Sequence, residues 1–268
     1  MALRLIDTHS HIYDTQFDED RDDIVIRARQ AGIQRLYLPA IDEESYEAMF
    51  ALVRQYLELC RPMMGLHPTS VNDNPGWREA LDQVACCYLA TPPEGIRFYG
   101  VGEVGLDFYW SRDWKDEQVE ALRFQIELAL QYDLPLVVHT RDAWDEMCML
   151  MQEYAGRGLR GIMHSFCGSV DHYKALKGSG DFLFGIGGPV TYKRSTLPDT
   201  LREIPLAELV LETDSPYLPP VPYRGKRNES AYVELVALKL AELYGVTPEE
   251  VAETTTRNAL RMFGEDLE

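Results

Sequence analysis

Short apolar segments alternate with longer segments of helical spacing along the chain, and this alternation limits the possible folds more than any other feature. Eight apolar segments have the length of strands, at residues 3–6, 35–39, 62–66, 99–102, 134–138, 161–163, 182–186 and 209–211. Segments whose apolar residues recur at helical spacing lie between them, the clearest being 115–132. The pattern predicts strand–helix units, and therefore parallel strands joined by helical crossovers.

Eight such units in 268 residues fit an α/β fold of the (β/α)8 TIM barrel type. We expect one domain over 1–268, with extra C-terminal helices over 230–244 and 247–263. The other helices are expected over 17–31, 43–60, 77–90, 115–132, 143–154, 170–177 and 197–204. A doubly wound open sheet is the alternative, but no Gly-x-Gly-x-x-Gly follows the first strand, as its dinucleotide-binding version requires.

Composition restricts the partners and the location that we expect. A net charge of −18 argues against a protein that coats or represses duplex DNA, because such proteins present a basic face. An enzyme that holds a strand end with a few basic residues and metal ions remains compatible with this charge. No apolar stretch approaches the roughly 20 residues that span a bilayer, and the N-terminus lacks a signal-peptide pattern. Five cysteines without a Cys-x-x-Cys pair favour reduced, mostly buried thiols in a cytoplasmic protein.

Residue types that bind metals stand directly after the predicted strands. His9 and His11 follow the first strand two positions apart, so in extended backbone both imidazoles point to the same side. Further candidates follow later strands, namely Glu103, His139, His164 and Asp214. In a barrel the carboxyl ends of the strands converge on one mouth. Each residue alone has an ordinary explanation, such as a core histidine or a rim carboxylate, but together they predict a metal centre.

The number of candidates predicts two divalent metal ions. One ion would be surrounded by His9, His11, Glu103 and Asp214. The other would share Glu103, as a bridging carboxylate, and take the histidines after the fifth and sixth strands. Such a pair suits phosphoryl transfer, with Mg or Mn for activity, while the imidazoles also suit Zn, Ni or Co. We expect Glu103 and Asp214 to be catalytic, with Asp214 deprotonating the nucleophilic water.

Several motifs, in order and across nearly the whole chain, resemble those of the TatD family of metal-dependent deoxyribonucleases. They lie at 7–11, 65–68, 102–109, 134–141, 164–166, 211–217, 224–228 and 256–259. The resemblance implies a distorted TIM barrel in which Glu103 takes the role of a lysine-derived bridging ligand. It also implies hydrolysis of phosphodiester bonds, typically by an exonuclease or in DNA repair and turnover. The ligands that it implies are His9, His11, Glu103, His139, His164 and Asp214.

Basic and aromatic residues in the loops after the strands are candidates for substrate contacts. Four donors after the strands are candidates for phosphate binding, and the alternative for each is a solvated loop charge: His67, Arg141, Lys193 and Arg227. His67 is the preferred candidate, because a His-Pro pair at a strand end is sterically fixed. Four aromatic residues can either stack on a base or pack within loops: Tyr109, Trp110, Phe166 and Tyr217. We expect Asp107 and Glu212 to orient ligand histidines.

Three functions are compatible with these residues. The first is a monomeric deoxyribonuclease that acts on DNA, mainly at single-stranded ends, with no membrane or protein partner. The second uses the same metal centre to cleave an ester or amide, as an aminoacyl-tRNA deacylase or a small-molecule amidohydrolase does. The third is a metal-binding scaffold without catalysis, against which the intact Asp214 carboxylate argues.

Overall fold

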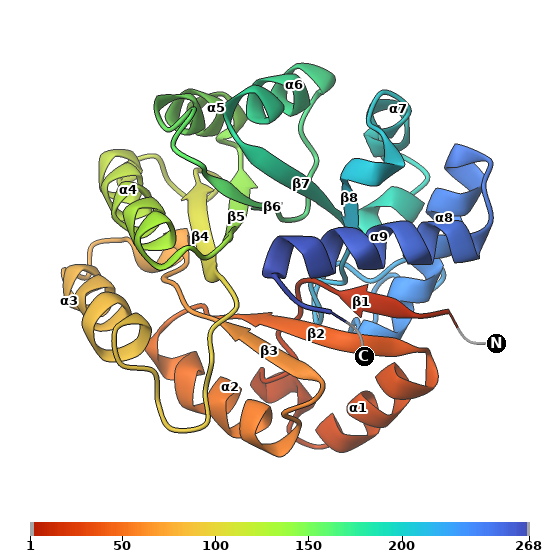
Figure 1. The fold of residues 1–268 in the computed structure, drawn as a ribbon, viewed down its shortest axis with the longest axis horizontal. Helices are drawn as coiled ribbons and strands as arrows, with labels where there is room; N and C mark the ends of the chain where they lie inside the picture. Colours follow the sequence, from red (N-terminus) through yellow and green to blue (C-terminus); the bar gives the residue numbers. More distant parts are fainter. Residues whose placement is uncertain (1–2, 267–268) are drawn as a thin grey trace.

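The structure is a computed structural model that describes residues 3–266, and Figure 1 shows its strands surrounded by helices. The strands are β1 (Leu5–Asp7), β2 (Ile33–Pro39), β3 (Cys60–Met63), β4 (Val101–Asp107), β5 (Leu136–Arg141), β6 (Arg160–Met163), β7 (Asp181–Ile186) and β8 (Leu209–Leu211). Every paired neighbour is parallel, and the strands follow one another in chain order. This order has no reversal point, so the doubly wound alternative is wrong and the (β/α)8 prediction is confirmed.

The barrel is distorted because its strands form two sheets, β1–β3 and β4–β8. Isolated backbone hydrogen bonds connect the sheets at both seams. At the first seam the amide of Thr8 donates to the carbonyl of Leu211 at 3.0 Å. At the second, the amide of Gly102 donates to the carbonyl of Met64, also at 3.0 Å.

The helices mostly occupy the predicted segments, with shorter bounds. They are α1 (Arg21–Gln30), α2 (Glu43–Gln55), α3 (Trp77–Gln83), α4 (Lys115–Tyr132), α5 (Trp144–Glu153), α6 (Val170–Ser179), α7 (Leu197–Leu201), α8 (Val233–Tyr244) and α9 (Pro248–Phe263). The prediction of helix over 43–60 is too long, because its last apolar residues lie beyond α2. Of these, Leu57 is 57% exposed and does not continue the buried face. The predicted helix 77–90 divides into α3 and a π-helical turn, Val84–Leu89.

Strand β4 is longer than its apolar pattern predicts. The apolar pattern indicated 99–102, whereas the strand begins at Val101 and continues through Glu103 to Asp107. All seven of its residues are buried. The pattern failed here because two buried carboxylates interrupt it, and burial of such groups requires partners that a local sequence window cannot show.

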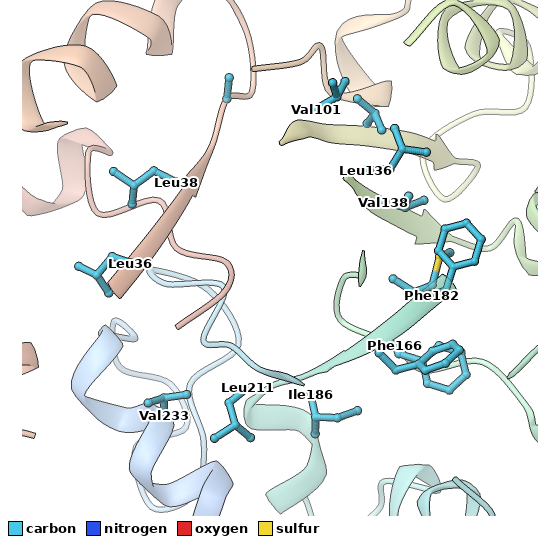
Figure 2. Close-up of a cluster of buried hydrophobic side chains, with 14 of the residues drawn as sticks. Leu36, Leu38, Val101, Leu136, Val138, Phe166, Phe182, Ile186, Leu211 and Val233 are labelled. Atoms are coloured by element: carbon cyan, nitrogen blue, oxygen red, sulfur yellow. The ribbon is translucent and has the colours of Figure 1, made fainter. Parts of the chain in front are cut away.

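Alternate strand residues serve two different packing layers. Leu36 and Leu38 of β2 belong to the large cluster between strands and helices, and Figure 2 shows them on the helix side of the strand. Tyr37 between them points into the barrel, where one side chain from each of seven strands meets α9. This inner layer consists of Ile6, Tyr37, Met63, Val137, Ile162, Leu183 and Val210, with Ala259, Met262 and Phe263 of α9.

Helix α9 covers the amino ends of the strands. The ring of Phe263 stacks on Tyr37 with centroids 3.7 Å apart. Asn258 donates to the carbonyl of Leu209, the first residue of β8, at 2.8 Å, and Thr256 donates to the carbonyl of Arg4 at 3.1 Å. The ligand candidates lie at or near the carboxyl ends of the strands, and therefore at the end of the barrel opposite to α9.

Two further predictions can be compared with the structure. The prediction that the thiols are mostly buried is wrong, because Cys60 is buried but Cys86, Cys87 and Cys167 are exposed. The apolar residues next to a cysteine in the sequence did not show whether its side chain points to the core or to solvent. No helix within residues 3–266 has the length and apolar character needed to cross a membrane.

Candidate metal centre

The loops after β1 and β8 are fixed to each other through Asp7, a fully buried carboxylate. Asp7 accepts hydrogen bonds from the amide of Thr213 at 2.9 Å and from its hydroxyl at 2.6 Å. The amide of Asp214 donates to the carbonyl of His9 at 2.8 Å, and the amide of His11 donates to the carbonyl of Ser215 at the same distance. Burial raises the pKa of Asp7 to about 7, although the bonds from Thr213 oppose the shift. This network holds His9, His11 and Asp214 at one place.

One group of ligand candidates converges on the Oε2 atom of Glu103. The Nε2 atom of His9 lies 3.1 Å from this oxygen, and that of His11 lies 3.5 Å from it. The two Nε2 atoms are 3.1 Å apart. Asp214 also reaches both imidazoles, with Oδ1 3.7 Å from Nε2 of His9 and 3.5 Å from that of His11.

A second group surrounds the other oxygen of Glu103. Oε1 lies 3.0 Å from Nδ1 of His139, 3.5 Å from Nε2 of His67 and 3.9 Å from Nε2 of His164. His164 also lies 3.7 Å from Oδ1 of Asp214, so it stands between the two carboxylates. The structure therefore brings together all six residues that the sequence indicated as ligands, and it adds His67 to the second group.

The residues present fit divalent cations. One ligand atom from each of His9, His11 and Glu103 lies within 4.8 Å of the other two. The two Nε2 atoms are 3.1 Å apart, and two neutral imidazoles at this distance can share at most one proton. His67, Glu103 and His139 form a second such group. The Nδ1 of His9 is buried and has no hydrogen-bond partner within residues 3–266. Imidazole with carboxylate is a donor set of divalent transition metals.

Burial and charge act against each other at this centre. Burial lowers the pKa of His9, which keeps its imidazole neutral and its lone pair free. Burial by itself would raise the pKa of Glu103, but the surrounding histidines, His9 first, hold it well below the usual value. For His164 the carboxylates prevail over burial, Glu212 above all, and raise its pKa to about 10. A cation that binds here replaces protons, so its affinity depends on pH.

Three further residues contact the histidines, and one of them, Glu212, could also hold a cation together with His9 and His164. Nε2 of His139 lies 2.9 Å from Oδ2 of Asp107, within hydrogen-bonding distance. Nδ1 of His164 lies 3.0 Å from Oε1 of Glu212, but the angle at this contact does not meet that of a hydrogen bond. These are the contacts predicted for Asp107 and Glu212. The third residue, Tyr13, was missed. Its hydroxyl donates to the carbonyl of Pro39 at 2.5 Å and accepts from Nδ1 of His11 at 2.8 Å. Tyr13 follows His11 by two positions, a spacing that places side chains on one side only in extended backbone. Because β1 ends at Asp7, the spacing alone did not predict this contact.

The centre opens into a cavity of about 740 Å³ at the carboxyl ends of the strands. Its lining includes several of the residues proposed for substrate binding, namely His67, Trp110, Arg141, Phe166 and Tyr217. Lys193 and Arg227 are not part of this lining. Lys193 is exposed on the loop after β7, and Arg227 contacts Asp20 at 2.6 Å and the carbonyl of Gln16. The sequence indicated the loop of each residue but not the direction of its side chain.

Comparisons with known proteins agree with this geometry. The family model described as TatD related DNase matches residues 6–264. The chain is 34% identical over 260 residues to YabD of Bacillus subtilis, an uncharacterized metal-dependent hydrolase, covering 97% of this chain and 98% of YabD. It is 30% identical over 266 residues to the 3'-5' ssDNA/RNA exonuclease TatD of Shigella flexneri, covering 97% and 99%.

A solved structure is similar over the same length. The TatD homologue YjjV of Escherichia coli has a TM-score of 0.89 and 29% sequence identity, and the alignment covers 99% of this chain and 100% of YjjV. The matched strands include those that carry the ligand groups. This chain is therefore a metal-dependent hydrolase and belongs to the TatD-related DNase family.

Proposed function

We propose that this protein hydrolyses phosphodiester bonds of DNA, at strand ends and with two divalent cations. The observation that carries the proposal is the position of Glu103, a buried carboxylate whose two oxygens face different groups of histidines next to a cavity. Cations held by these two groups would share Glu103, and a pair of divalent cations can supply the charge that phosphoryl transfer needs. The Shigella relative is a 3'-5' ssDNA/RNA exonuclease by name, and this supports exonucleolytic action on single strands.

Asp214 is the proposed general base. Burial raises the pKa of Asp214, but the neighbouring imidazoles, His164 first, outweigh burial and hold it below the usual value. The carboxylate is therefore ionised at neutral pH and is able to accept a proton from the attacking water. Divalent cations held by the two groups would draw charge from the phosphate and lower the pKa of that water.

His67 and Arg141 are proposed to bind the phosphate, because both line the cavity. Burial lowers the pKa of His67, so this imidazole is neutral, and its Nδ1 accepts from the amide of Thr69. With the proton on Nε2, the ring would donate that N–H to a phosphate oxygen, and the second cation would be left to Glu103, His139 and His164. Arg141 is exposed, and its guanidinium lies 3.6 Å from the ring centroid of Tyr109. Arginine stacked in this way keeps its edge N–H groups free for phosphate oxygens.

Two exposed aromatic rings stand beside this arginine. Tyr109 is 52% and Trp110 is 76% exposed, and Trp110 lines the cavity. Large exposed rings at a cavity are suited to stacking on unpaired bases, which a duplex interior does not offer. This favours a frayed or single-stranded end as the substrate. Action as a monomer in the cytoplasm remains a prediction from the sequence.

The test is digestion of end-labelled single-stranded DNA, duplex DNA and RNA with Mg, Mn, Zn, Ni or Co, or with EDTA. We expect mononucleotide release from single-stranded DNA with Mg or Mn and none with EDTA. The Asp214→Asn variant, checked for an unchanged melting temperature, should be inactive. Equal activity in that variant would refute the role of Asp214, and absence of cleavage with every metal would refute the nuclease function.

The alternative, a hydrolase of esters or amides including aminoacyl-tRNA, uses the same centre and needs a separate comparison. Arg141→Gln removes a phosphate donor without altering the ligand groups. If the substrate is a phosphodiester, this variant should cleave DNA more slowly. If a panel of esters and amides is cleaved by both proteins at one rate and DNA by neither, the alternative is correct.

A further inference from the structure

The arginine and lysine side chains of this acidic protein divide into two classes. Most form ion pairs with nearby carboxylates, as Arg123 does with Glu153 and Arg157 with Glu127. A smaller class forms no ion pair within residues 3–266, and four of its members lie on two neighbouring loops: Lys193, Arg194, Arg224 and Lys226. The chain has 44 acidic residues, so four neighbouring cationic side chains without a carboxylate partner in the described part of the chain are unexpected.

Each of the two loops contains a segment without acidic residues, although Glu212 and Asp214 precede the second segment and Glu229 follows it. Residues 187–198, after β7, and residues 215–228, after β8, contain five arginine and lysine residues and no aspartate or glutamate. The fifth cation, Arg227, is the one that pairs with Asp20 on the neighbouring loop before α1. Both loops leave the carboxyl ends of their strands, and therefore stand on the face of the barrel that carries the metal centre.

The loops are fixed side by side by hydrogen bonds. The amide of Val221 donates to the hydroxyl of Thr191 at 2.9 Å, and the hydroxyl of Tyr192 donates to the carbonyl of Pro219 at 2.9 Å. The guanidinium of Arg224 lies 4.3 Å from the ring centroid of Tyr192, next in sequence to Lys193. A stacked arginine has its N–H groups pre-organised at its edge, so these contacts form a defined cationic surface.

This surface continues the wall of the active-site cavity outward. The same two loops supply part of the cavity lining through Gly187, Pro189, Tyr217 and Leu218. A strand whose terminal nucleotide occupies the cavity, and which leaves it over this part of the wall, has its next phosphates close to these loops. The net charge of −18 would repel that part of the strand elsewhere on the molecule.

We propose that Lys193, Arg194, Arg224 and Lys226 form a strand-binding patch, which holds backbone phosphates of a single-stranded nucleic acid several nucleotides from the bond that is cut. The inference rests on the proposed function and adds a binding surface outside the metal centre. A single strand suits the patch because it is a narrow pair of loops, whereas a duplex needs a broad basic face. Recognition of phosphates predicts that DNA and RNA strands are both bound.

The test compares two double variants with the same loss of charge. Arg224→Ala/Lys226→Ala changes the patch, and Arg97→Ala/Lys174→Ala is the control. Among the residues that the structure describes, Arg97 also has no ion-pair partner, and its guanidinium lies 5.0 Å from the ring centroid of Tyr99. It precedes β4, at the amino end of the barrel. Lys174 is exposed on α6.

Binding is measured by fluorescence anisotropy of labelled single strands, with EDTA present to prevent cleavage, over a range of salt concentrations. With a strand of about 20 nucleotides, we expect the patch variant to bind on the order of tenfold more weakly at low salt. The slope of log affinity against log salt should fall by about 0.7 for each lost phosphate contact, and the control should match wild type.

The outcomes separate this inference from the proposed function. If the patch variant binds like the control, or if duplex DNA binds more tightly than single strands and loses affinity equally, the inference is wrong. If the wild-type protein cleaves DNA but the patch variant binds strands as tightly as the control variant, the strand-binding patch is refuted and the proposed function is not. Loss of strand binding in the patch variant, together with no cleavage by wild type, supports the patch and refutes the proposed function.

Discussion

Asp107 lies 2.9 Å from Nε2 of His139, which leaves Nδ1 as the nitrogen that faces Glu103. Burial raises the pKa of the Asp107 carboxyl, but the contact with His139 outweighs burial and lowers it, so the ion pair persists at neutral pH. In Asp107→Asn this orienting charge is lost, and we expect about 10- to 100-fold weaker binding of divalent metal. Isothermal titration calorimetry with Mn or Zn measures the change. Unchanged affinity would show that Asp107 does not orient the ring.

Tyr13 fixes the proton of His11. Because the Tyr13 hydroxyl donates to Pro39, its oxygen accepts from Nδ1 of His11, and the lone pair remains on Nε2. Tyr13→Phe should weaken metal binding and lower the free energy of unfolding by about 1–3 kcal/mol, the cost of unpaired buried groups. Urea unfolding and metal titration provide the two measurements.

Tyr46→Phe is the matched control for this prediction. Tyr46 is also buried, and its hydroxyl donates to the carbonyl of Gly65 at 3.2 Å, away from the ligand groups. We expect Tyr46→Phe to lose stability without losing metal affinity. Equal metal affinities in both variants would contradict a specific role of Tyr13.

Glu103 should matter for both ligand groups, whereas Asp214 contacts His9, His11 and His164. Glu103→Gln keeps the side-chain volume but removes the charge that the two groups share. We expect this variant to lose metal at both groups and Asp214→Asn to retain at least one equivalent. Metal analysis after dialysis gives the stoichiometry. Full occupancy in Glu103→Gln would refute a bridging role.

The exposed ring of Trp110 is predicted to stack on a base. Stacking of one base contributes about 1–3 kcal/mol, so Trp110→Ala should raise the KM for strand cleavage by on the order of tenfold. Phe124→Ala on α4 is the control, because Phe124 is also exposed, at 37%, and does not line the cavity. Steady-state kinetics with a fixed strand tests this, and equal KM values for the two variants would argue against stacking.

Cys60 is predicted to resist alkylation. Burial raises the pKa of the Cys60 thiol to about 12, so the reactive thiolate does not form between pH 7 and pH 9 in the folded protein. Raising the pH over this range should leave Cys60 unmodified by iodoacetamide, while the exposed Cys86 and Cys87 react. Peptide mapping by mass spectrometry reads the result. Reaction of Cys60 at the rate of Cys86 would contradict its burial.

The sequence was most informative where one local rule decided the structure. The periodicity of 115–132 predicts α4 with both bounds correct, because a buried stripe and helical spacing agree there. The sequence pattern gave wrong bounds for a strand where contacts with distant residues decide its length. Strand β4 continues through Glu103 and Asp107 because histidines from other strands stabilise these carboxylates inside the barrel. No window of neighbouring residues contains those partners.

The sequence by itself determined the order of eight parallel strands and the positions of six candidate ligands, because strand–helix alternation sends every strand end to one mouth. Only the tertiary structure decided which atom of each ligand faces its neighbours. In the structure the two oxygens of Glu103 face different histidines, and the hydroxyl of Tyr13 contacts Nδ1 of His11. Arg227 forms an ion pair with Asp20 and does not line the cavity. The physical reason is that side-chain direction depends on packing and on charges brought together from distant parts of the chain. His9 and Glu103 contact each other across 94 residues.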